Sequence, residues 1–272
     1  MSGGRQLARG LAALVALGLL ALVACRSVPV PEASSNNRNA PLPGNTEGDF
    51  HKRAQVRMTL AATYYQQGQL QTAMEEARRA IEIDPGLASA YGLMGLVQSD
   101  LGQPLEAQAS FERGLALAPN DPELANNYGW FLCRNGRVRE SIPYFDRAAA
   151  NRLYQTPAMA LQDAGICLRQ VKDDKAAERY LLRALEADAT TPVAKFQLAE
   201  LYLGRRQFDR ADFYYELLAR SVEANAESTW LGARIAHAKG DERQARRLGE
   251  LLTGRYPDSP QAAALRQGHW DE

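Results

Sequence analysis

The sequence predicts an all-α solenoid in which six pairs of antiparallel helices stack one after another. Three observations carry this prediction. Small residues recur every 34 residues from Ala54 onward, glycine recurs near the middle of each interval, and proline recurs near the end of several intervals. A fixed period of this length is the sequence signature of a repeat architecture.

The predicted repeats occupy residues 54–87, 88–121, 122–155, 158–191, 192–225 and 226–259, with Thr156 and Pro157 inserted after the third. Positions 8, 20 and 27 of the repeats provide eighteen slots, of which sixteen hold Gly, Ala or Ser; Leu218 and Leu252 are the exceptions. Small residues let two helices approach closely, while larger residues at positions 7, 11 and 24 fill the remaining space. Each repeat should therefore contain a helix A, a turn and a helix B.

Glycine and proline predict where these helices begin and end. Glycine at position 15 tolerates the left-handed conformation that ends helix A. Proline cannot extend a helix and marks the end of helix B, whereas Asp, Thr or Ser directly before proline predicts a capped helix start. The turn glycines are Gly68, Gly102, Gly136 and Gly240, the end prolines Pro85, Pro119 and Pro257, and the starts Asp121-Pro122, Thr156-Pro157, Thr191-Pro192 and Ser259-Pro260.

Two places depart from the pattern. Pro143 stands at position 22, inside helix B of the third repeat, where it is expected to bend or delay that helix. The sixth repeat lacks large residues at positions 7, 11 and 24, which are Gly232, Ala236 and Gly249. We expect it to be a thin terminal unit, with residues 260–272 as a C-terminal cap and tail.

The N-terminus predicts export and a lipid anchor. Arg5 and Arg9 precede an apolar run over residues 11–24, which is typical of a signal peptide and too short for a stable membrane span. Residues 22–25, LVAC, resemble the lipobox of bacterial lipoproteins, which implies cleavage after residue 24 and acylation of Cys25; an ordinary secretory signal is the alternative. Arg26, in place of aspartate, favours the outer membrane by the same resemblance. Residues 25–50 are expected to form the lipidated cysteine and a flexible linker.

Composition argues against several classes of function. The chain has 32 basic and 32 acidic residues and no basic stripe, so nucleic-acid binding is not expected. Its three histidines, His51, His237 and His269, have no second histidine at metal-binding spacing and no nucleophile in a recognisable motif. We therefore predict no catalytic residue, cofactor, metal or small-molecule substrate. An enzyme with an unrecognised site is the weakest of the hypotheses that remain.

The repeat pattern resembles the tetratricopeptide repeat over residues 54–259, nearly all of the chain that follows the signal peptide. The resemblance implies a right-handed superhelix in which the A helices line a concave groove for a peptide or a helix of another protein. Apolar residues on that face of the first two repeats suit an apolar strand or helix of a membrane-bound client; alternatively they are half-buried or covered by the linker. They are Met58, Ala62, Tyr65, Leu93 and Leu96.

The stretch NNYGWFLCR, residues 126–134, should be helix A of the third repeat. Tyr128, Gly129 and Leu132 fall on core positions. Asn126 and Trp130 fall on the groove face and are candidate partner-binding residues. Alternatively, the asparagine bonds neighbouring helix ends and the tryptophan packs on the next repeat.

Cys133 and Cys167 lie on adjacent A helices of the third and fourth repeats. In an oxidising periplasm they form either a disulfide or two separate buried thiols. The residues NNYGWFLCRNGR, in the third of six repeats behind a lipobox, also resemble the PilF/PilW family of type IV pilus biogenesis lipoproteins. In some members of that family a disulfide joins repeats three and four, which agrees with these two cysteines.

The same resemblance implies an outer-membrane lipoprotein on the periplasmic face that acts as a pilotin. Such a protein promotes assembly or localisation of the pilus secretin, PilQ, or stabilises the pilus that supports twitching motility. Its protein partner would be the secretin or a segment of another envelope protein. It would also attach to the membrane through its N-terminal lipid. A periplasmic adaptor that regulates a cell-wall hydrolase or another envelope assembly machine is the alternative function.

Overall fold

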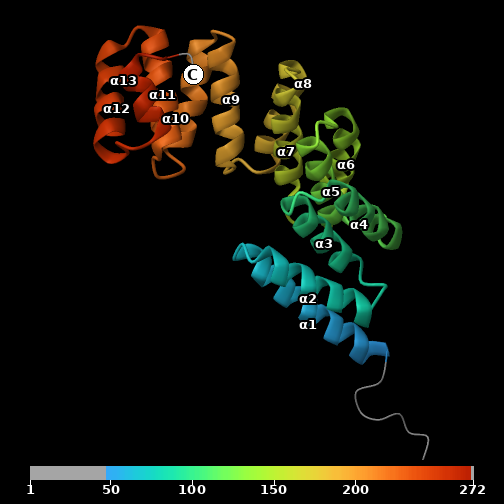
Figure 1. The fold of residues 1–272 in the computed structure, drawn as a ribbon. Coiled ribbons are helices and arrows are strands. Elements are labelled where there is room, and N and C mark those ends of the chain that lie inside the picture. Colours follow the sequence, from blue (N-terminus) through green and yellow to red (C-terminus); the bar gives the residue numbers. More distant parts are fainter. Residues whose placement is uncertain (1–46, 271–272) are drawn as a thin grey trace, which may run out of the picture. The chain divides into compact units, whose positions relative to one another are not determined.

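The computed structural model describes residues 47–270, so the signal peptide, Cys25 and most of the expected linker lie outside the described residues. Within that range the chain contains thirteen α-helices and no strand. The helices follow one another along the chain, each joined to the next by a short connection (Figure 1). The all-α solenoid of helix pairs that the period predicts is confirmed. None of these helices is long and apolar enough to cross a membrane.

Each predicted repeat contains one A helix and one B helix. The A helices are α1 (Glu47–Gln66), α3 (Ala88–Asp100), α5 (Pro122–Arg134), α7 (Pro157–Gln170), α9 (Pro192–Gly204) and α11 (Ala226–Lys239). The B helices are α2 (Leu70–Ile83), α4 (Pro104–Leu117), α6 (Val138–Ala150), α8 (Asp174–Ala187), α10 (Phe208–Ala219) and α12 (Glu242–Arg255). A last helix, α13 (Pro260–Gln267), follows the sixth repeat.

The first helix begins earlier than the sequence predicts. The expected linker, residues 25–50, overlaps α1, which already starts at Glu47. The added turn is held by contacts that a composition argument cannot supply. His51 Nδ1 lies 2.6 Å from Asp84 Oδ2 at the end of α2, and the Arg53 guanidinium lies over the Phe50 ring.

The A helices form a more tightly packed layer than the B helices. Consecutive A helices touch each other along the whole series, from α1 with α3 to α9 with α11. Among the described residues, no two consecutive B helices approach each other in this way. Side chains on neighbouring A helices are therefore close enough to bond to one another, and the B helices form the outer layer.

Small residues at position 8 make room for the large residue at position 24 of the same repeat. A methyl group added at Gly95 would lie 2.8 Å from the Phe111 ring, closer than van der Waals contact allows. Gly129 stands in the same relation to Phe145, at 3.0 Å. In the first repeat, where position 24 is Ala77, alanine replaces glycine at position 8.

The sixth repeat is thin because its neighbours fill it. Gly232 leaves room for the Tyr215 ring of the fifth repeat, which a methyl group there would meet at 2.2 Å. Gly249 does the same for Leu265, at 3.0 Å. Leu265 belongs to α13, which packs on α11 and α12 and closes that end of the core.

Two of the four predicted helix caps are absent, and the delay that Pro143 predicts for its helix does not occur. Asp121 and Ser259 accept hydrogen bonds from the backbone N–H groups of the third helical residues, but Thr156 and Thr191 do not cap their helices. The Thr191 hydroxyl instead donates to the Asp188 carbonyl oxygen, at 2.8 Å. Pro143 does not delay its helix, because α6 starts at the same repeat position as α4 and α8.

Position 15 is left-handed in every repeat. The four predicted glycines have φ between 72° and 79°. In the fourth and fifth repeats the same position holds Lys172 and Arg206, with φ of 60° and 58°. The turn thus imposes this conformation on two residues that carry a Cβ, and such a residue is strained by roughly 1–2 kcal/mol in the left-handed region.

Replacing Lys172 with glycine should therefore stabilise the chain by about 1 kcal/mol, since the relief of strain exceeds the added freedom of the unfolded chain. Gly136→Ala, at the same position of the third repeat, should destabilise it by a similar amount. Urea unfolding followed by circular dichroism checks both variants. Equal or opposite shifts would contradict this explanation of the turn.

Candidate functional site

Polar side chains link each A helix to the next one. At the first two junctions the shared residue is Asp100, at the end of α3. Tyr65 Oη of α1 donates to its carboxylate at 2.7 Å, and Arg134 Nη1 of α5 donates to it at 2.9 Å. One carboxylate thus bonds to both neighbouring helices.

Glu200 of α9 plays the same part in the second half of the chain. Arg169 Nη1 of α7 donates to Glu200 Oε2 at 3.3 Å and to Gln197 Oε1 at 2.5 Å. Arg234 Nη1 of α11 lies 3.5 Å from Glu200 Oε1. We call this series of contacts between consecutive A helices, from Tyr65 to Arg234, the A-helix ladder.

The middle of the ladder is a buried amide–carboxyl pair. Asn126 Nδ2 of α5 donates to Asp163 Oδ2 of α7 at 3.2 Å, and the Asn126 side-chain oxygen is buried without a hydrogen-bond partner. Burial raises the pKa of Asp163 to about 6, although hydrogen bonds from Asn126 and Gln162 act in the opposite direction. The carboxyl therefore takes up a proton more readily in the folded chain than in the unfolded chain.

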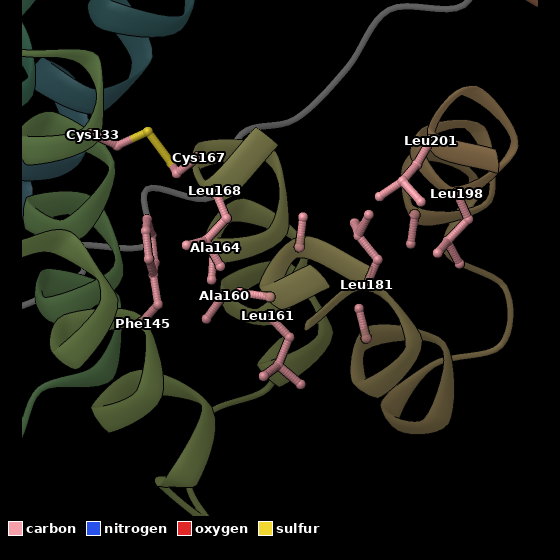
Figure 2. Packing of buried hydrophobic residues seen from close by; sticks show 14 of the residues in the cluster. Cys133, Phe145, Ala160, Leu161, Ala164, Cys167, Leu168, Leu181, Leu198 and Leu201 are labelled. Carbon is pink, nitrogen blue, oxygen red and sulfur yellow. A yellow bond between two sulfur atoms is a disulfide. The ribbon is translucent and has the colours of Figure 1, made fainter. Parts of the chain in front are cut away.

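A disulfide lies at the same junction. Cys133 of α5 and Cys167 of α7 are bonded, with their Cα atoms 5.8 Å apart (Figure 2). Both side chains are buried in a cluster that extends through Phe145 and Leu181 (Figure 2). The third and fourth repeats are thus joined covalently as well as by packing.

The seven predicted groove residues do not form one open apolar strip. Met58, Ala62 and Tyr65 are half-buried against a cluster that includes the buried Leu93. Leu96 packs in a second cluster, between the second and third repeats. The two candidates on α5 are also engaged. Asn126 is buried and bonds the Asp163 side chain, not a helix end, and Trp130 packs against the cluster around the disulfide.

Sequence reasoning missed the role of the residues after α13. Trp270 stacks between Trp230 and His237 of α11, with ring centroids 5.2 and 4.2 Å away, and its carbonyl oxygen accepts a hydrogen bond from Arg234 Nε at 3.0 Å. The sequence contained a signal for this contact, because two large ring side chains, Trp230 and His237, lie on the groove face of the last repeat and could be covered by the residues after it.

Two cavities adjoin α9 and α11. The larger, of about 710 Å³, lies at the C-terminal end of α9 and is bounded by Trp270. The smaller, of about 330 Å³, lies at the N-terminal ends of both helices beside Phe196 and Val222. Across the part of the chain that the structure describes, no group of three or more His, Cys, Asp or Glu side chains is placed to hold a metal ion.

Comparisons with known proteins agree with this architecture. Models of the tetratricopeptide repeat family match residues 54–87, 93–155 and 132–192. This fold is a protein-interaction module, and its members bind protein partners through stacked helix pairs. The fold and the face of A helices therefore define a tetratricopeptide-repeat protein.

The similarity to individual proteins narrows the class. The chain is 29% identical to the type IV pilus assembly protein PilF of Pseudomonas aeruginosa, over 91% of this chain and 94% of that protein. The crystal structure of PilW, a type IV pilus biogenesis factor, matches with a TM-score of 0.73 and 31% identity, over 79% of this chain and 98% of that one. A structure of Pseudomonas aeruginosa PilF matches with a TM-score of 0.71 and 26% identity, over 80% of this chain and 99% of that one. The chain belongs to the PilF/PilW family of tetratricopeptide-repeat proteins of type IV pilus biogenesis.

The Asp163 carboxyl should make stability depend on pH. Between its ordinary pKa of 3.8 and about 6, the folded chain holds a proton that the unfolded chain has lost. The free energy of unfolding should fall as pH rises through this window and stay lower above it, by on the order of 2–3 kcal/mol.

Asp163→Asn should remove this loss, because an amide has no ionised form in this pH range; its NH2 group can in addition donate to the unpaired oxygen of Asn126. Urea unfolding between about pH 4 and pH 8 measures the difference between the variant and the unmodified chain. Asp258→Asn, at an exposed carboxylate, is the matched control. Parallel pH profiles for Asp163→Asn and the unmodified chain would refute the assignment.

Reducing the disulfide should lower the free energy of unfolding by about 2–4 kcal/mol, the usual effect of a bridge in a chain of this kind. The bridged cysteines are 34 residues apart, so the bond removes considerable freedom from the unfolded chain. Melting with and without reductant checks this expectation. A Cys133→Ser, Cys167→Ser double variant should melt like the reduced chain in both conditions, and insensitivity of the unmodified chain would argue against the bridge.

Proposed function

We propose that the protein is an outer-membrane lipoprotein, a pilotin that promotes assembly and localisation of the type IV pilus secretin through protein–protein binding. One observation carries the proposal: similarity to PilF extends along 91% of the chain, which also has the LVAC lipobox at residues 22–25. A chain that brings a partner to a membrane needs both a binding surface and an anchor.

The described residues support the binding part of this proposal. The A-helix ladder and the disulfide hold the A helices in fixed register, which reduces the loss of conformational entropy when a partner binds. Half-buried apolar side chains such as Met58 and Tyr65 lie on the A-helix face of the first repeat. We propose that an apolar segment of the secretin covers them while it awaits assembly.

The anchor is proposed from the sequence alone, because Cys25 lies outside the described residues. Acylation of its sulfur and of the new amino group would provide two or more chains, and stable membrane attachment requires at least two such signals. The helix pairs would then remain at the periplasmic face of the outer membrane, where a secretin subunit must insert.

Deleting the gene should reduce heat-stable secretin multimers on unheated gels and abolish twitching motility. Cys25→Ser should move the protein out of the outer-membrane fraction and reduce multimers in the same way, because the anchor locates the binding surface. Restoring the unmodified gene is the control.

Normal multimers and motility in the deletion strain, with altered cell-wall hydrolysis, would replace this proposal with the hydrolase-adaptor function. Outer-membrane localisation of the Cys25→Ser protein would refute the lipid anchor.

A further inference from the structure

The larger cavity beside α9 and α11 combines an apolar wall with positive charge. Its volume is about 710 Å³. Leu203, Phe208 and Trp270 contribute apolar surface, and none of the described aspartate or glutamate residues lines the cavity. Its ionisable side chains are Arg206, Arg234 and His237.

Two of these three side chains already have acidic neighbours. Arg234 lies 3.5 Å from Glu200, and His237 Nδ1 lies 3.2 Å from Glu242 Oε1, although the geometry of that contact is not that of a hydrogen bond. The nearby Lys239 is likewise paired, with Asp212 at 2.6 Å. The Arg206 side chain makes no hydrogen bond, ion pair or ring contact with any described residue. The cavity therefore has one cation whose charge is not neutralised within the described part of the chain.

The backbone gives Arg206 a second distinguishing feature. It occupies the left-handed turn position that is glycine in four repeats, a conformation that strains a residue with a Cβ. Strained residues occur preferentially at functional sites. Lys172 shares the conformation at the equivalent turn, yet it does not line this cavity, so the two positions separate the effect of the turn from that of the cavity.

The opposite wall is held in place before any ligand arrives. Trp270 is stacked between Trp230 and His237, and its backbone oxygen is bonded to Arg234. A ligand that enters the cavity thus meets an ordered aromatic ring on one side and a guanidinium group on another. Such preorganisation lowers the entropy cost of binding.

We propose that this cavity binds an acidic residue flanked by an apolar or aromatic residue in an extended segment of a protein partner. The carboxylate would accept paired hydrogen bonds from the Arg206 guanidinium, and the neighbouring side chain would cover Trp270 and Phe208. This inference rests on the proposal that the face of A helices binds proteins, and it does not depend on which protein binds.

The geometry favours a peptide over simpler anions. A small inorganic anion would satisfy Arg206 but leave the apolar wall of a 710 Å³ cavity in water. Attraction to anionic lipid headgroups usually requires a cluster of basic side chains, whereas this cavity offers one cation that has no acidic neighbour among the described residues. An acidic residue beside an apolar one matches both halves of the cavity.

Fluorescence anisotropy tests the proposal on the purified, disulfide-bonded chain with a short labelled peptide in which Asp alternates with Leu and Phe. The same peptide with Asn in place of Asp controls for charge. Arg206→Gly removes the guanidinium and also relieves the strained turn, so it should fold at least as stably as the unmodified chain. Lys172→Gly makes the equivalent change at the other strained turn and is the matched control.

We expect the Asp peptide to bind in a salt-sensitive manner and Arg206→Gly to weaken binding by about tenfold or more, the usual loss for a charged hydrogen-bond partner. The unmodified chain should bind the Asn peptide as weakly as Arg206→Gly binds the Asp peptide, and Lys172→Gly should leave binding of the Asp peptide unchanged. No binding of the Asp peptide, equal binding by Arg206→Gly, or equal binding of the Asn peptide would each overturn the proposal.

Binding of inorganic phosphate or of anionic vesicles that competes fully with the peptide would also overturn it, in favour of a simple anion or a lipid. The failure of this proposal can be told apart from the failure of the proposed function. Normal secretin multimers in the deletion strain would refute the pilotin function and leave the peptide measurements unaffected.

Discussion

The close crossing of helices A and B at position 8 is the constraint on which the structure depends. Gly95 and Gly129 have no Cβ at the point where the Phe111 and Phe145 rings contact the backbone. The absence of a Cβ therefore sets the distance between helices A and B in these repeats. Because this crossing recurs every 34 residues, the A helices come into contact in series while the B helices remain apart. The A-helix ladder can form only on helices that are already this close.

The ladder contributes more to register than to stability. Its ion pairs are partly exposed, and such pairs usually contribute no more than about 1 kcal/mol each. Asp100 and Glu200 each bond to the helix before and the helix after, so a shift of one helix would break two contacts. The disulfide fixes the junction at Asn126 and Asp163, where a buried carboxyl with a raised pKa makes packing less favourable at neutral pH. A covalent bond thus lies at the junction whose polar contact includes this buried carboxyl.

The sequence predicts the helix pairs well because packing at small residues is a local, periodic property. It predicts the ends of the helices less well. Thr191 bonds a preceding carbonyl instead of capping α9, and the first turn of α1 depends on a contact between His51 and Asp84 from the next helix. The candidate site shows the same limit: the pattern places Asn126 and Leu93 on the face of helix A, but only the packing of the next repeat shows that both are buried. Position on a helix can be read from the period, whereas exposure depends on neighbours that are brought there by folding.

Unsatisfied groups therefore locate candidate binding sites on this face better than exposure does, provided that a ligand can reach them. A partner that binds Asp100 or Glu200 must first compete with an arginine of the same chain, and the exchange gains little. The Asn126 side-chain oxygen has no hydrogen-bond partner among the described residues, but it is buried. It therefore lowers the stability of the packed helices and is not accessible to a partner. Arg206 is exposed, has no partner among the described residues, and adjoins an aromatic wall that is already ordered. A partner that neutralises it gains a charge-assisted bond without displacing an existing one, and for this reason we place the more specific contact at the last two repeats.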